Sequence, residues 1–186
     1  MDSPVIWIAI AVALLIVVIL IAVFAGRTRR SLRRRFGNEY DRAVAQHDSR
    51  EAAHADLQAR IERRSGYDVR DLDDSAALAY VERWRGIQRR FVEDPATGLL
   101  EADTLVVEVA EQRGYPAQGW DRQAADISVD HADAMDDYRR ARAVAYDTRD
   151  GAAGTEEMRS ALLRYRAMFE RLVGRRVDEV DQEERA

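Results

Sequence analysis

The sequence contains no cysteine and no lysine among its 186 residues. Without thiols the chain can form no disulfide, no cysteine-ligated zinc site and no cysteine nucleophile. Without lysine it has neither the phosphate-binding lysine of a Walker-type loop nor an amine for Schiff-base chemistry. These absences exclude several classes of enzyme, and the missing cysteines also fit a reducing compartment.

Strand-like patterning is missing too, because no stretch alternates between apolar and polar residues with a period of two. In the second half of the chain, apolar residues instead recur at spacings of three and four. We therefore expect an all-α fold. It comprises an N-terminal transmembrane helix, a long polar juxtamembrane helix and a small helical bundle of about four to five helices.

The longest apolar run, residues 5–25, contains 21 consecutive residues without a charge. At about 1.5 Å per residue, a helix of this length matches a hydrocarbon core of about 30 Å. A cleaved signal peptide would combine a basic N-terminus with a shorter apolar run, whereas this chain begins with Asp2 and has a longer run. The pattern predicts a retained anchor that contacts the lipid bilayer through residues 5–25.

A cluster of basic residues follows this run directly. Its members are Arg27, Arg29, Arg30, Arg33, Arg34 and Arg35. Because cationic flanks stay on the cytoplasmic side, we expect a single-pass topology with the N-terminus outside and the C-terminal domain in the cytoplasm. The same arginines are a candidate lipid-facing cluster, since each attracts anionic lipid by about 1 kcal/mol near a membrane surface.

The rest of the chain is acidic. Subtracting the six arginines and Asp2 from totals of 29 basic and 34 acidic residues leaves 23 and 33, an excess of ten negative charges. Binding to nucleic acid requires a positive surface that releases counterions from phosphates. We therefore expect no nucleic-acid partner.

The sequence predicts five segments: a transmembrane anchor over 1–26, a basic then polar juxtamembrane helix over 27–64, a linker over 65–74, a helical bundle over 75–173 and a charged tail over 174–186. Gly37 is a candidate break between the first two helices. Within the bundle, helices are expected over 75–94, 97–113, 120–127 and 130–148, with a last one from Thr155. The first of them should bury Leu78, Val81, Trp84, Ile87 and Phe91.

Three polar residues of the juxtamembrane segment form a weak metal-binding candidate. On one continuous helix, His47, Glu51 and His54 would share a face, and Glu51 with His54 matches the Glu-x-x-His pattern of di-iron bundles. Such a centre needs a second copy of this pattern and two further glutamates, which the chain lacks. A homodimer could supply the second copy, so this reading stays open as an alternative, with no cofactor expected in the single chain.

Two other groups of residues are candidate sites. Ser128 lies between acidic residues and close to His131, but it lacks the Gly-x-Ser-x-Gly setting of a hydrolase nucleophile, and the group fits helix capping better. A candidate docking loop contains Tyr115, Pro116 and Trp120, whose aromatic rings would either be exposed to a partner or cover the core. We find no catalytic motif.

Several sequence blocks, taken in order, resemble a widespread family of uncharacterised bacterial proteins. The blocks are RRRFGNEYDRAV, ERWRGIQRRFVEDP, EADTLVVEVAEQRGYP, RQAADISVDH and LLRYRAMFERL, which together span residues 33–172. The resemblance implies a bacterial origin, a helical fold and, as in some relatives, a single N-terminal membrane helix, which would lie in the cytoplasmic (inner) membrane. It implies no activity. Ala132 stands where many relatives would have proline, which affects where the helix around it begins.

The function expected from the sequence is a membrane-anchored interaction or scaffold protein that binds another protein or itself. Two alternatives stay open: a metal-binding bundle that uses the Glu51 and His54 pattern in a homodimer, and a membrane-surface sensor whose arginine cluster responds to lipid charge or stress.

The predicted topology can be tested with a reporter fused after Ala186. We expect activity from a reporter that works only in the cytoplasm, and a mature chain that keeps its first 25 residues, because the basic flank holds the C-terminal side inside. A reporter located beyond the membrane, or a mature chain that starts near Gly26, would contradict the prediction.

Overall fold

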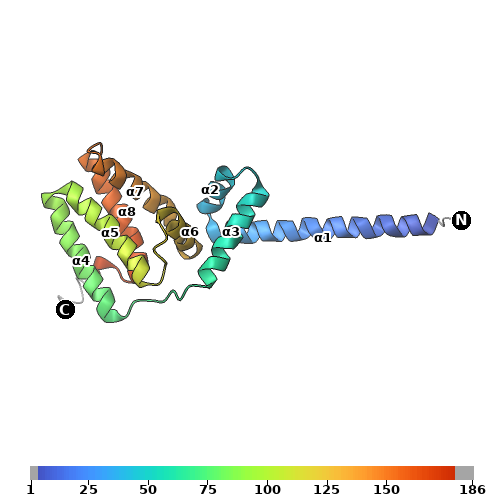
Figure 1. Ribbon diagram of the computed structural model, residues 1–186, viewed down its shortest axis with the longest axis horizontal. Helices are drawn as coiled ribbons and strands as arrows, with labels where there is room; N and C mark the ends of the chain where they lie inside the picture. The colour runs from blue at the N-terminus through green and yellow to red at the C-terminus, as the bar shows by residue number, and fades with distance from the viewer. Residues whose placement is uncertain (1–3, 179–186) are drawn as a thin grey trace. The chain divides into compact units, whose positions relative to one another are not determined.

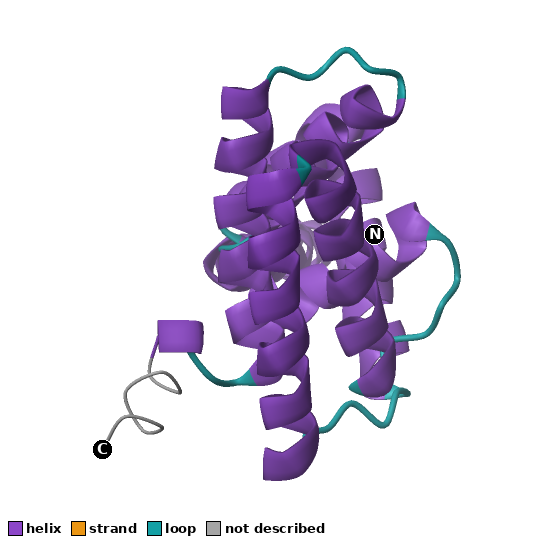
Figure 2. Ribbon diagram, turned by 90° about the vertical axis from the view of Figure 1, so that its left-hand side faces the viewer, coloured by secondary structure: helices purple, strands orange, loops and turns teal. Residues whose placement is uncertain are grey.

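The computed structural model describes residues 4–178, and for residues 4–6, 8–11, 18–25 and 28 it describes the backbone alone. All regular secondary structure in the described part is helical, so the predicted all-α class is confirmed (Figures 1 and 2). Contacts divide the chain into two compact units, residues 1–57 and residues 58–186. We describe each unit by itself.

The first unit contains three helices where the sequence predicted a membrane helix followed by one long polar helix. They are α1 (Pro4–Phe36), α2 (Asn38–Gln46) and the first half of α3 (Arg50–Ser65). Gly37 separates α1 from α2 with a positive φ of 49°, as expected for a glycine break. The second break was not predicted: His47 is extended, and the Ser49 hydroxyl accepts a hydrogen bond from the Ala52 N–H at 3.1 Å, which starts α3.

The α1 backbone is one continuous helix of 33 residues, so the predicted boundary at residue 26 is not a helix end. Among the described residues, no helix is both long enough and apolar enough to cross a bilayer. The side chains at 5, 6, 8–11 and 18–25, which form most of the predicted span, lie outside the described residues.

The second unit is a five-helix bundle that contains α4 (Asp74–Glu93), α5 (Pro95–Gln112), α6 (Trp120–His131), α7 (Met135–Arg149) and α8 (Thr155–Val173). Helix α5 is central, because it packs against α4, α7 and α8, while α7 also packs along α8 (Figure 1). The predicted number of bundle helices is correct. The boundary between α6 and α7 is not, since α6 continues to His131 and α7 begins five residues later than predicted, at Met135.

Aromatic side chains fill the centre of the bundle. Trp84 of α4 stacks on Phe169 of α8 with ring centroids 4.8 Å apart, and Tyr138 of α7 meets Tyr165 edge-on. Leu78, which was predicted to face inward, is 40% exposed, and the buried positions beside it are Ala77 and Tyr80. The buried face of α4 is therefore rotated by one residue at its N-terminal end.

Short polar residues fix where the central helices begin. The Asp73 carboxylate accepts a hydrogen bond from the Ala76 N–H at 2.8 Å and caps α4. Asp94 caps α5 in the same way through the Thr97 N–H, and Pro95 occupies the first turn, where no backbone donor is required.

The second half of α3 is tied to α6 by polar contacts. Arg63 forms an ion pair with Asp126, which is 1% exposed, and Arg64 pairs with Asp130. The Tyr67 hydroxyl donates a second hydrogen bond to Asp126 at 2.8 Å. Because of these contacts, the second unit begins inside α3, before the predicted linker. The acidic residues on either side of Ser128 therefore have a structural role.

A close backbone contact lies between α4 and α5. A Cβ atom added to Gly98 would lie 2.6 Å from the Cα atom of Phe91, which is closer than such atoms approach one another. Gly98 therefore lets the N-terminal turn of α5 contact the backbone of α4 directly.

We expect Gly98→Ala to lower the free energy of unfolding by about 1–3 kcal/mol, because the added methyl group forces the two backbones apart. Gly86→Ala is the matched control: its Cβ would meet only the end of the Arg89 side chain, at 3.9 Å. That control should raise stability by up to about 1 kcal/mol through helix propensity. Urea unfolding followed by tryptophan fluorescence measures both, and equal effects of the two variants would contradict the packing argument.

Candidate groove between helices α4 and α5

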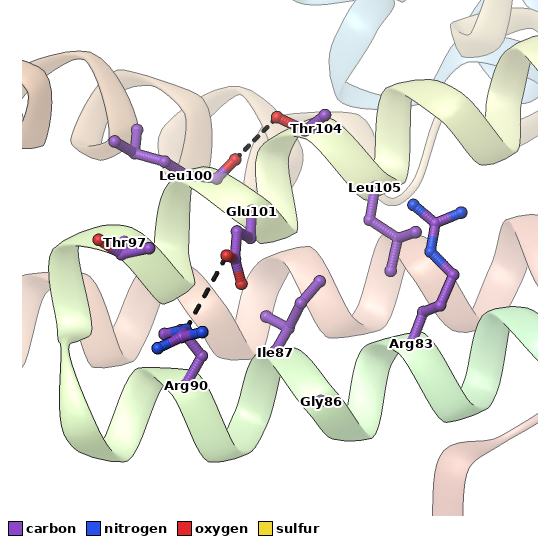
Figure 3. Close-up of a pocket in the computed structure, with 9 residues that line it drawn as sticks. All are labelled: Arg83, Gly86, Ile87, Arg90, Thr97, Leu100, Glu101, Thr104 and Leu105. Carbon is purple, nitrogen blue, oxygen red and sulfur yellow. Dashed lines mark hydrogen bonds and ion pairs between the residues drawn. The ribbon is translucent and has the colours of Figure 1, made fainter.

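An open groove runs between α4 and α5 and has a volume of about 590 Å³ (Figure 3). Both helices contribute residues at spacings of three and four, so one face of each helix forms one wall. The lining residues are Arg83, Gly86, Ile87 and Arg90 from α4, and Thr97, Leu100, Glu101, Thr104 and Leu105 from α5. Because the site lies between the faces of two neighbouring helices, it is an elongated groove and not a closed cavity.

The base of the groove is apolar. Ile87 is 7% exposed and Leu105 is 1% exposed, so both belong mainly to the core and show only an edge to the groove. Leu100, which also lines the groove, is half-buried. The Thr104 hydroxyl donates to the Leu100 carbonyl oxygen at 3.0 Å, which satisfies the hydroxyl within the helix and leaves its methyl group for contacts. The groove therefore presents aliphatic surface to anything that enters it.

Ion pairs line the rim of the groove. Arg83 donates two hydrogen bonds of 2.6 Å to the two carboxylate oxygens of Glu108, and these bonds lower the pKa of Glu108 and raise that of Arg83. Arg90 lies 4.0 Å from Glu101 across the groove. Because each rim arginine has an acidic partner, the rim carries little net charge and is not a phosphate-binding surface.

Gly86 is one of the α4 residues that line the groove. It lies in the middle of α4, where glycine costs roughly 1 kcal/mol relative to alanine. No close contact explains it, since an added Cβ would have only the far end of Arg89 within 4 Å. The glycine is therefore not required by packing, and its effect is to lower one wall of the groove.

A buried carboxylate behind the groove holds α5 in position. Asp103 is 3% exposed and accepts hydrogen bonds from the Tyr165 hydroxyl at 2.9 Å, from Arg142 at 2.6 Å and from Arg149 at 3.2 Å. Burial and the nearby Asp103 charge raise the pKa of Tyr165, so its hydroxyl stays protonated and donates. This network ties the rear face of α5 to α7 and α8.

The structure does not assemble the predicted metal-binding face. His47 ends α2, whereas Glu51 and His54 lie on α3, so the three residues do not share one helix. The His47 Nδ1 atom lies 2.8 Å from the Ala43 carbonyl oxygen, and the His54 Nε2 atom lies 2.9 Å from the Tyr40 hydroxyl. Among the described residues, no group of three or more potential ligands could hold a metal ion.

The predicted docking loop is mostly a part of the core. Tyr115 is 1% exposed, and its hydroxyl donates to Asp130 at 2.6 Å. Trp120 packs edge-on against Tyr138 with centroids 4.9 Å apart, while Pro116 is half-buried. The hypothesis of an exposed aromatic patch is therefore wrong for this loop. Burying large aromatic rings in the bundle is more favourable than exposing them to water.

The basic cluster is accessible on α1. Its six described arginines are exposed, and Arg27, Arg30, Arg34 and Arg35 line a shallow hollow with Ser31. Arg33 lies 3.7 Å from Asp41 of α2. Whether these arginines contact lipid stays a prediction.

Sequence reasoning missed the groove itself. The one available signal was Gly86, an isolated glycine inside a helical pattern, which often marks a close approach or a functional surface. No protein-family model, curated protein or solved structure matches the chain. The resemblance to a bacterial family therefore stays an expectation, and the groove has to be interpreted from its own geometry.

We expect Asp103→Ala to lower the free energy of unfolding by about 3–5 kcal/mol, because it leaves the half-buried Arg142 and the buried Tyr165 hydroxyl without their acceptor. Glu108→Ala, which removes a partner from the more exposed pair with Arg83, should cost at most about 1 kcal/mol. Urea unfolding of both variants checks the contrast. A loss below 1 kcal/mol for the Asp103 variant would show that the network does not hold α5.

Proposed function

We propose that this chain is a membrane-anchored helical interaction protein, and that the α4–α5 groove binds a helical segment of another protein. The observation that carries the proposal is the open wall at Gly86, which keeps an apolar groove accessible at a cost in helix propensity. Helix-in-groove recognition uses this combination of two helical walls and an aliphatic base. A partner helix would present apolar residues at spacings of three and four.

The rim supports specificity for such a partner. Two oppositely charged pairs, Arg83 with Glu108 and Arg90 with Glu101, lie along the walls. A partner helix that carries both acidic and basic residues can place an acid beside each rim arginine and a base beside each rim glutamate. A partner with one sign of charge would be repelled by the rim residues of the same sign. The groove thus favours an amphipathic helix of mixed charge over a nucleic acid or a simple anion.

The anchoring part of the proposal rests on the sequence of α1. The run of 21 uncharged residues and the arginines that follow it favour a single-pass segment, with the bundle on the cytoplasmic side of a bacterial inner membrane. The side chains described within this run, Trp7 and Val12 to Val17, are at least half exposed where they are large and apolar. Exposure of this kind is unfavourable in water and favourable in lipid.

A second candidate function is binding of the arginine cluster to an anionic membrane surface, and the observation that favours it is the exposure of all six arginines on one helix. This reading predicts binding of the chain to anionic vesicles that weakens as salt is added. It is compatible with the groove, because it uses a different part of the chain.

The groove can be tested by filling it. We expect Gly86→Leu to weaken capture of a membrane-associated partner at least tenfold, because a side chain at the centre of an interface removes about 1.4 kcal/mol or more of binding energy. Ala79→Leu is the matched control, since Ala79 is an exposed residue of the same helix outside the groove.

The measurement is quantitative mass spectrometry of proteins that copurify with each full-length variant from membranes, with circular dichroism as a check of folding. A partner that is lost with Gly86→Leu and kept with Ala79→Leu supports the proposal. If both variants retain the same proteins as the original chain, the groove is not the binding site.

A further inference from the structure

A second apolar surface lies on the bundle, away from the groove. It is formed where the C-terminal end of α4 meets the N-terminal half of α8, around a hollow of about 460 Å³. We call it the α4–α8 face, and its apolar residues are Phe91, Val92, Pro95, Leu162 and Leu163. The positions on α4 differ from those that line the groove, so the two surfaces are on different sides of that helix.

The centre of the α4–α8 face is unusually exposed for its residue types. Val92 is 84% exposed and Leu163 is 62% exposed, the largest values among the exposed apolar side chains described in the bundle. Helix packing does not require either residue, because both point away from the core that Trp84 and Phe169 fill. Adjacent exposed aliphatic residues of this kind mark an interaction surface.

The polar residues of the face carry one charge of each sign. Glu156 and Arg159 line it from adjacent positions on one face of α8, and in the described part of the chain neither side chain forms an ion pair or hydrogen bond. Other charged residues of the same helix do have partners, such as Arg164 with Asp137 and Arg171 with Asp133. The α4–α8 face therefore combines an uncovered apolar centre with an acid and a base that are free to pair elsewhere.

We propose that the α4–α8 face binds the same face of a second copy of this chain. In an interface with two-fold symmetry every contact is made twice, with the two partners exchanged. Glu156 of one copy then pairs with Arg159 of the other, and the reciprocal pair forms as well. A face with a single sign of charge would repel its own copy, whereas this face is neutral and self-complementary.

This dimer goes beyond the proposed partner binding and does not depend on it. The groove stays open on the other side of α4, so a dimer would present two grooves to partners and increase avidity for a membrane-bound target. Gly86→Leu should leave the dimer unchanged, which separates a failure of the groove proposal from a failure of this one.

Charge reversal on the full-length chain in detergent tests the proposal. We expect Glu156→Arg or Arg159→Glu alone to weaken dimerisation about tenfold, since each places like charges together twice in the interface. The double variant Glu156→Arg/Arg159→Glu should restore the original affinity to within about twofold, because the pairs are re-formed with exchanged signs. Analytical ultracentrifugation gives the dissociation constant of each form.

The control is Arg140→Glu, which makes the same change of charge at an exposed position of α7 outside the face and should have no effect. A chain that is monomeric at all concentrations, or a dimer that ignores both single reversals, overturns the proposal. Single reversals that weaken the dimer without rescue by the double variant also overturn it, because they indicate a different arrangement.

The absence of cysteine allows a second measurement in membranes. Leu163→Cys should form a covalent dimer under mild oxidation, because the residue lies at the centre of the proposed interface. Leu78→Cys is the control: it is 40% exposed at the opposite end of α4, about 21 Å from Val92 along the helix. Equal cross-linking of both variants would mean random collision and would count against the α4–α8 face.

Discussion

The burial of Asp103 on the central helix is the interaction on which the bundle depends. A carboxylate in an apolar interior is unfavourable unless hydrogen bonds and opposite charges surround it, and Tyr165, Arg142 and Arg149 supply both. These partners come from α8 and α7, so the carboxylate fixes the rear of α5 against two helices at once. The front of α5 is then free to form one wall of the groove.

The two proposed surfaces exist because α4 packs against other helices on only part of its circumference. Its buried side packs Trp84 on Phe169, and its backbone approaches α5 at Gly98. The rest of its circumference exposes two other sides, one lined by Gly86 and one carrying Val92. A small bundle cannot bury every apolar residue of a helix that has neighbours on only part of its circumference, and the remainder becomes available for binding.

Local patterns predicted the features that depend on neighbouring residues. The helical spacing of Val81, Trp84 and Ile87, three residues apart, identified α4 and its buried side, and the break at Gly37 was expected. The pattern failed at His47, where a helix end is set by the capping hydroxyl of Ser49 rather than by a proline or glycine. It left open whether Tyr115 is exposed or buried, because an aromatic loop has the same sequence in either case.

The sequence alone determined the all-helical class, the absence of thiol and lysine chemistry, and the separation of an apolar first segment from an acidic remainder, because composition and periodicity are local properties. Only the tertiary structure decided which residues meet across helices. Asp103 and Tyr165 are 62 positions apart, and Asp126 and Arg63 are 63 apart. No local pattern encodes these pairs, since they form only after packing has brought distant helices to a fixed distance and orientation.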